Sequence, residues 1–143
     1  MAEQISKLKR ETEFVRIVAH SIGCLHALQA ASLLAESERP SSMHLCAPAC
    51  SEKEIEDILK KEVAGQTHVY FSSSDYLLSY LYRVQGFGLK KAIGSEGLKE
   101  NYPGVNLLDV KDHFEFFVHT EYCNRFHRFA ALETIKINKN QKQ

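Results

Sequence analysis

Runs typical of β-strands alternate with amphipathic stretches typical of helices along most of the chain, and this alternation constrains the fold more than any other feature. The strand-like runs are Phe14–Ala19, Met43–Ala47, His68–Ser72 and Val105–Val110. Helical periodicity separates them. The alternation predicts an α/β fold: a parallel sheet of about four strands, flanked by helices that make right-handed crossovers.

The expected helices follow from apolar spacing and from end signals. They are Glu3–Thr12, Ile22–Glu36, a helix that begins at Ser51, Asp75–Val84 and Thr120–Leu132. Ser51 and Glu54 have the spacing of a capping box, in which the two side chains satisfy free amides at a helix start. In the second helix the periodicity predicts a buried face made of Ile22, Leu25, Leu28, Gln29, Ser32 and Leu33.

Length and charge limit the classes of protein to consider. The 143 residues suit a single domain, which we place at residues 1–137, with a polar tail at 138–143. Eighteen Lys and Arg balance eighteen Asp and Glu, so no long-range field favours a nucleic acid. No run approaches the ~18 apolar residues that would cross a bilayer, so no transmembrane segment is expected.

The four cysteines are informative about the cellular compartment of the protein and do not indicate a metal site. Cys24, Cys46, Cys50 and Cys123 form no Cys-x-x-Cys pair, and the N-terminus does not have the pattern of a secretory signal. We therefore expect thiols packed in the core, no bound metal and a cytoplasmic location. The glycine-rich stretch from Gly86 to Gly97 follows a helix rather than a strand, so no nucleotide cofactor is expected.

The segment Ala19-His20-Ser21-Ile22-Gly23 carries the main chemical signal. It lies between an expected strand and an expected helix, and small residues stand two positions on either side of Ser21. A serine on such a bend is exposed above the strand ends, and the amide of Ile22 can contribute to an oxyanion hole. A plain Ser-Gly turn at a helix start is the alternative interpretation.

A serine nucleophile needs a base, and the base needs an orienting acid. Asp75 follows the third strand and His119 follows the fourth, so both are expected at the sheet edge where Ser21 lies. Asp75 could equally be a helix-capping residue, and His119 an ordinary surface histidine. The rival base is His113, and the rival acids are Asp109 and Asp112.

The order Ser, Asp, His after successive strands is the order found in α/β-hydrolases. FVRIVAHSIGCLHALQAASLL resembles the nucleophile strand, elbow and following helix of that superfamily. VYFSSSDYLLSYLYR, GVNLLDV and HTEY are similar to an intracellular branch of it. The resemblance covers about Phe14 to Leu132 and implies that the chain corresponds to the C-terminal half of such a hydrolase, with Ser21, Asp75 and His119 as catalytic residues.

The resemblance implies cleavage of an ester, thioester or amide, a small molecule or a lipid, without a cofactor. The aromatic stretch 114–117, with Tyr76, Tyr80 and Phe87, could line an apolar pocket. A complete hydrolase of this kind has about eight strands, with the nucleophile after an interior one. Here the nucleophile follows the first strand, so we expect a homo-oligomer, a complementing chain or a region upstream of this sequence to cover that strand. The alternative function is an inactive half-hydrolase that serves as an assembly or interaction subunit.

Overall fold

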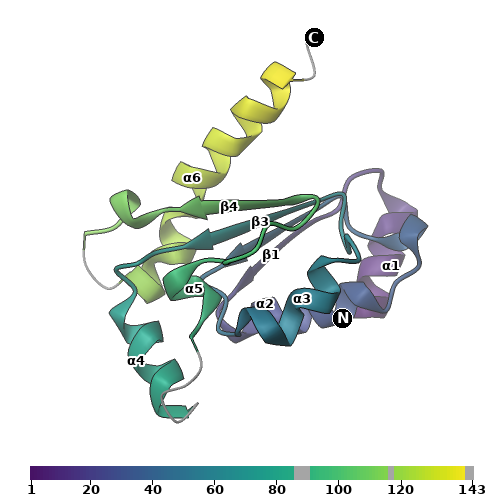
Figure 1. Cartoon of the computed structure of the whole chain (residues 1–143). Coiled ribbons are helices and arrows are strands. Elements are labelled where there is room, and N and C mark those ends of the chain that lie inside the picture. The colour runs from purple at the N-terminus through teal and green to yellow at the C-terminus, as the bar shows by residue number, and fades with distance from the viewer. Residues whose placement is uncertain (86–90, 116–117, 141–143) are drawn as a thin grey trace.

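The computed structural model of the chain describes residues 1–85, 91–115 and 118–140. Four strands form one sheet: β1 (Arg16–His20), β2 (Ser42–Cys46), β3 (Gln66–Phe71) and β4 (Val105–Asp109). All neighbouring strands are parallel, and their order across the sheet is the order in sequence. The predicted α/β fold with a four-stranded parallel sheet is confirmed (Figure 1).

Helices cover both faces of this sheet. They are α1 (Ala2–Glu11), α2 (Ile22–Ser32), α3 (Glu52–Leu59), α4 (Tyr76–Gln85), α5 (Ile93–Glu96) and α6 (Val118–Asn140), with two short 3₁₀ turns, η1 (Glu36–Glu38) and η2 (Lys111–His113). Figure 1 shows α2 and α3 on one side of the sheet and the first part of α6 on the other. Within the described residues, none of the helices is long and apolar enough to cross a membrane.

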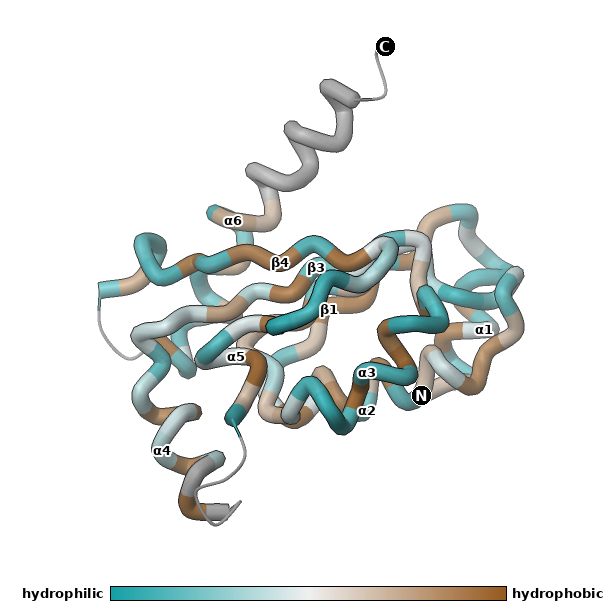
Figure 2. Tube along the Cα trace, in the orientation of Figure 1, coloured by the Kyte–Doolittle hydropathy of each residue, from teal (hydrophilic) through white to brown (hydrophobic). Residues whose placement is uncertain are grey.

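Each face of the sheet has its own apolar core. Met43, Leu45 and Val69 point toward α2 and α3, while Cys46 and Tyr70 point toward α6. Successive residues of a strand face opposite sides, so β2 and β3 contribute to both cores. Figure 2 shows hydrophobic positions recurring along the strands that carry these cores.

The buried face of α2 differs from the one predicted. Five residues of α2 are buried: Cys24, Ala27, Leu28, Ala30 and Ala31. Of the predicted face, Leu28 is buried and Leu25 packs half-buried against the core, whereas Ile22 is 53% exposed and Leu33, just after the helix, is 79% exposed. Small side chains let α2 approach the sheet closely, so the periodicity of the large apolar residues was the wrong guide.

Other element boundaries shift by a few residues. The capping box at Ser51 and Glu54 is present, as predicted. α5 falls within the stretch that we expected to be a loop, and α6 continues to Asn140, beyond the predicted end at Leu132 and into the predicted polar tail. In α1, Ile5 is buried and Leu8 is 49% exposed.

β1 is the edge strand of the sheet on the side of the N-terminus. All five residues of β2 are buried, whereas none of the five in β1 is fully buried, and Val18 is 51% exposed. Since β1 pairs only with β2 among the described strands, one row of its backbone amides and carbonyls has no strand partner.

Candidate active site at the carboxyl ends of the strands

The structure brings Ser21, Asp75 and His119 together in one hydrogen-bonded chain. Ser21 directly follows β1, Asp75 comes four residues after β3, and His119 lies in the first turn of α6, after β4. The Ser21 hydroxyl lies 3.1 Å from His119 Nε2, and His119 Nδ1 lies 2.8 Å from Asp75 Oδ2. Because parallel strands end at the same edge of a sheet, residues 98 positions apart in sequence come into contact.

Ser21 has a backbone conformation that is unfavourable for a residue with a side chain. Its φ is 55° and its ψ is −127°, between the end of β1 and the start of α2. The Ser21 amide donates to the Cys46 carbonyl at 3.0 Å, and the Ser21 carbonyl accepts from the amides of Cys24 and Ala49 at 3.1 and 3.2 Å. A strained residue persists when its surroundings fix it in this way, and such residues cluster at functional sites.

The segment that holds Ser21 is itself held by α5. The amide of Gly94 donates to the Pro48 carbonyl at 3.0 Å, just before Ala49. A side chain at Gly94 would come within 2.4 Å of the Ala47 backbone. Only glycine allows this close approach, which braces the loop after β2 against the elbow.

The hydrogen bonds determine the tautomer of His119. Asp75 accepts from Nδ1–H, so the neutral ring has its lone pair on Nε2, where it can accept the Ser21 proton. The His119 side chain is 14% exposed, and that of Asp75 is 0% exposed. In such a dry environment the carboxylate and the imidazole interact more strongly than they would in water.

Asp75 uses its two oxygens for different purposes. Oδ2 accepts from His119, while Oδ1 accepts from the amide of Leu78 at 3.0 Å and so caps the first turn of α4. The backbone amide of Asp75 in turn donates to the Ser72 carbonyl. The two interpretations of Asp75 left open by the sequence, helix cap and partner of a histidine, therefore hold together.

His20 is a second histidine at the site, for which the sequence suggested no role. Its Nε2–H donates to the carbonyl of His119 at 2.8 Å, and the two rings lie 4.8 Å apart. Burial, followed by the nearby His119 ring, lowers the pKa of His20, while the bond to the His119 carbonyl, which an Nε2–H donates in either protonation state, raises it in part. The residue before Ser21 thus holds the helix turn that carries His119.

Tyr122 lies one turn along α6 from His119 and is fully buried. Its ring is 5.9 Å from that of His20, and its hydroxyl has no hydrogen-bond partner among the described residues. Burial, with the charge of Asp75 as the next cause, raises the pKa of Tyr122, so the phenol stays protonated. The sequence pattern did not connect Tyr122 with the site.

Ile22 and Gly23 follow Ser21, and the sequence predicted a different role for each of them. Ile22 is the first residue of α2, where a backbone amide has no acceptor within its helix and the helix dipole favours negative charge. A Cβ on Gly23 would meet nothing within 4 Å among the described residues. The requirement for a small residue at position 23, predicted from the elbow pattern, is therefore not present in the described part of the chain.

The rival residues make their hydrogen bonds elsewhere. The His113 carbonyl accepts from Arg125, and its ring packs near Phe129 at 5.9 Å. Asp109 accepts from the amide of Lys111. Asp112 is exposed in η2. His119 and Asp75 are thus the histidine and the carboxylate that the fold places beside Ser21.

A pocket of about 570 Å³ adjoins Asp75 and His119. It lies between the start of α4 and the start of α6, and the apolar residues that line it are Tyr76, Leu77, Phe114 and Val118. The predicted aromatic pocket therefore includes Tyr76 and Phe114 but not Tyr80 among the described residues. Phe87, Phe116 and Phe117 lie outside the described residues.

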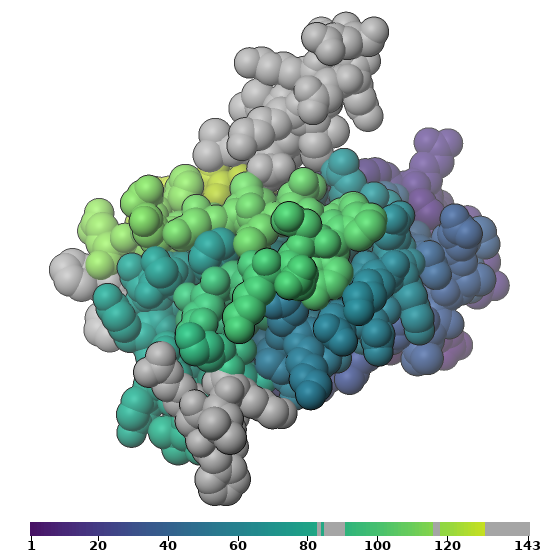
Figure 3. Space-filling view, viewed as in Figure 1, coloured from purple at the N-terminus to yellow at the C-terminus, as the bar shows by residue number. Residues whose placement is uncertain are grey.

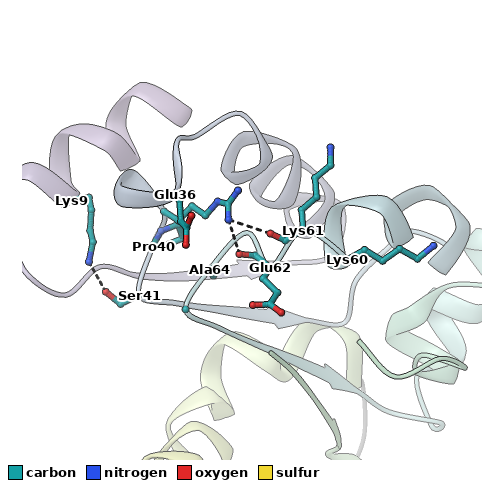
Figure 4. Close-up of a pocket in the computed structure, with 10 residues that line it drawn as sticks. Lys9, Glu36, Pro40, Ser41, Lys60, Lys61, Glu62 and Ala64 are labelled. Carbon is teal, nitrogen blue, oxygen red and sulfur yellow. Dashed lines mark hydrogen bonds between the residues drawn. The ribbon is translucent and has the colours of Figure 1, made fainter. Parts of the chain in front are cut away.

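A second pocket lies at the opposite, amino-terminal end of the strands. Lys9, Arg39, Lys60 and Lys61 line it together with Glu36 and Glu62. Figure 4 shows the ammonium groups of Lys60 and Lys61 pointing apart, while Arg39 donates to the carbonyls of residues 61 and 62. These cations do not converge on one point, so this pocket is a weaker candidate for a binding site.

The sequence also led us to expect buried cysteine thiols and no bound metal. Cys24, Cys46 and Cys50 are buried free thiols, as expected, whereas Cys123 is exposed on α6. Burial raises the pKa of Cys46 and of Cys50 to about 12, which makes both thiols unreactive. Over residues 1–85, 91–115 and 118–140, no cluster of three or more His, Cys, Asp or Glu could hold a metal ion.

No protein-family model, no curated protein and no solved structure matches this chain.

Proposed function

We propose that the protein is a serine hydrolase of the α/β-hydrolase type, in which Ser21, His119 and Asp75 act as nucleophile, base and orienting acid. The observation that carries this proposal is the continuous hydrogen-bonded chain from the Ser21 hydroxyl through the His119 ring to the buried carboxylate of Asp75. The strained φ of Ser21 supports it, because residues in such conformations cluster at functional sites.

The reaction follows from the directions of these hydrogen bonds. Ser21 Oγ attacks the carbonyl carbon of an ester, thioester or amide and transfers its proton to His119 Nε2. His119 then protonates the leaving group as its bond to carbon breaks, which gives an acyl-serine. A water molecule, deprotonated by the same imidazole, attacks the acyl group, and the proton returns to Ser21. Asp75 stabilises the imidazolium in both steps.

The amide of Ile22 is our candidate for stabilising the oxyanion, from its position at the start of α2. α/β-Hydrolases use a second amide from a loop elsewhere in the sheet, and losing one such donor costs roughly a hundredfold or more in rate. Within the described residues, the space next to a Cβ on Gly23 is open and β1 is an edge strand, which leaves room for such an element.

We propose that a strand from a second polypeptide, either another copy of this chain or a complementing chain, pairs with β1. An exposed edge strand offers unpaired amides and carbonyls that bind another strand readily. The exposed Phe14 and Val18 support this proposal, since both are apolar and belong to this edge. The expected result by light scattering is an oligomer, and a stable monomer would contradict it.

The same edge favours a second function, that of an inactive half-hydrolase that serves as an assembly subunit. In that case β1 is an interface, and the three polar residues keep their geometry without turning over a substrate. The free buried thiols support a reducing compartment, and so the proposed cytoplasmic location, for either function.

A fluorophosphonate probe separates the two functions, because it reacts covalently only with an activated serine. We expect wild-type protein to be labelled, and Ser21→Ala and His119→Ala to be unlabelled. Ser73→Ala and His113→Ala are matched controls, since each removes the same group at a nearby position outside both the hydrogen-bonded chain and the pocket. A folded wild-type protein that resists the probe, or labelling that survives in Ser21→Ala, would exclude the hydrolase.

A further inference from the structure

The pocket next to Asp75 and His119 lies on one particular side of the hydrogen-bonded chain. Its walls are the residues around Asp75 at the start of α4 and the residues around His119 at the start of α6. Ser21 is not among the described residues that line it. The pocket therefore adjoins the imidazole rather than the nucleophile.

This position decides which part of a substrate the pocket can hold. The acyl carbon becomes bonded to Ser21 Oγ, whereas the leaving-group oxygen must come within hydrogen-bond distance of His119 to receive its proton. The group attached to that oxygen extends past the imidazole. A pocket on the imidazole side is thus suited to the leaving group and not to the acyl chain.

The lining of the pocket indicates the chemistry of this leaving group. Leu77, Phe114 and Val118 present apolar surface, and Tyr76 is 78% exposed at the mouth. A volume of about 570 Å³ lies within the range of roughly 300–1,000 Å³ that is typical of small-molecule sites. Glu115 adds a negative charge to the rim, which disfavours a leaving group that carries phosphate or carboxylate.

Apolar surface continues from the mouth of the pocket along α4. Tyr80, Leu81 and Val84 are exposed on this helix, in line with Tyr76 and Leu77 at a spacing of four residues. Figure 2 shows hydrophobic positions recurring along α4, and in Figure 3 the helix extends beyond the rest of the body. A chain longer than the pocket could therefore lie along this helix.

We infer that the substrate is an ester of a neutral, apolar alcohol, and that the pocket between α4 and α6 binds the alcohol portion. This inference rests on the proposed hydrolase function. In the acylation step the bond between Ser21 Oγ and the acyl carbon forms, the bond from that carbon to the alcohol oxygen breaks, and His119 delivers to this oxygen the proton that it took from Ser21. Water completes the cycle, so that one ester and one water give one acid and one alcohol.

Two series of esters test which side of the ester the pocket binds. One series keeps the acetyl group and lengthens a straight-chain alcohol from ethyl to octyl, while the other keeps the ethyl group and lengthens the acid in the same steps. Straight-chain alcohols of these lengths are almost equal as leaving groups, so differences in kcat/KM report binding. We expect kcat/KM to rise roughly threefold per added CH₂ in the alcohol series and to change little in the acid series.

A matched pair of variants tests whether this pocket is responsible. Leu77 lines the pocket and is 49% exposed, whereas Leu81, one turn later on the same helix, is 46% exposed and is not among the described lining residues. We expect Leu77→Ser to flatten the dependence on alcohol length throughout the series, and Leu81→Ser, a change beyond the pocket, to affect only the longest alcohols. Equal effects of the two variants would overturn the assignment to this pocket.

Fluorophosphonate labelling of the same preparations separates failure of this inference from failure of the proposed function. Labelling at Ser21 with kcat/KM rising along the acid series, or equal along both series, would overturn the inference and leave the hydrolase standing. Absence of both labelling and hydrolysis would overturn the two together.

Discussion

Asp75 offers the sharpest test of the proposed site, because its two carboxylate oxygens have separable roles. In Asp75→Asn, the amide oxygen can still accept from Leu78 and cap α4, while the amide nitrogen faces His119. That nitrogen only donates, so His119 must turn its Nδ1 lone pair toward it and carry the proton on Nε2. The ring then cannot accept the proton of Ser21.

The expected magnitudes for the two roles differ. For Asp75→Asn we expect the rate to fall on the order of 10⁴-fold, as in other enzymes with this three-residue arrangement, and the free energy of unfolding to fall by less than about 1 kcal/mol. Asp75→Ala also removes the cap and leaves a buried amide unsatisfied. We therefore expect it to lose a further ~2 kcal/mol of stability, with a similar loss of rate.

The assay is the second-order rate constant for fluorophosphonate labelling, which needs no knowledge of the natural substrate, together with urea unfolding of each variant. Asp109→Asn is the matched control, since Asp109 is an exposed acid at the same edge whose carboxylate accepts from Lys111. Labelling of Asp75→Asn within tenfold of wild type would refute the tautomer argument. An equal loss of labelling rate in Asp109→Asn would refute it as well.

Three further predictions concern the elbow and the core. The free energy of unfolding of Ser21→Gly should be about 1 kcal/mol higher than that of Ser21→Ala, because only glycine adopts a φ of 55° without strain. Equal urea midpoints for the two variants would contradict this. His20→Ala should slow labelling roughly tenfold by freeing the turn that carries His119, whereas His26→Ala, an exposed histidine on α2, should not. Burial lowers the pKa of His44 from 6.5 to about 4, so the unfolded chain gains a proton at this residue before the folded chain does as the pH falls. The free energy of unfolding should therefore drop by up to about 3 kcal/mol between pH 6.5 and about pH 4. Below that range His44 should cause no further loss. His44→Gln, measured by urea unfolding across that range, should have a shallower slope, and an unchanged slope would show that another group is responsible.

The sequence by itself determined the fold class and the residues that the fold brings to one edge. β-Branched runs alternating with helical periodicity are local patterns, and each strand and helix needs only its own residues to be recognised. The capping box at Ser51 and the elbow at Ser21 are local in the same sense. Once the sheet is parallel, Asp75 and His119 must follow strands that end where Ser21 lies.

Only the tertiary structure decided the rest, because contacts between distant segments depend on how the elements pack. The buried face of α2 consists of small residues, since close approach to the sheet matters more there than the size of the apolar side chain. His20 and Tyr122 join the site only because the first turns of α6 lie against the end of β1. The choice of His119 over His113, likewise, depends on where η2 turns the chain before α6 begins.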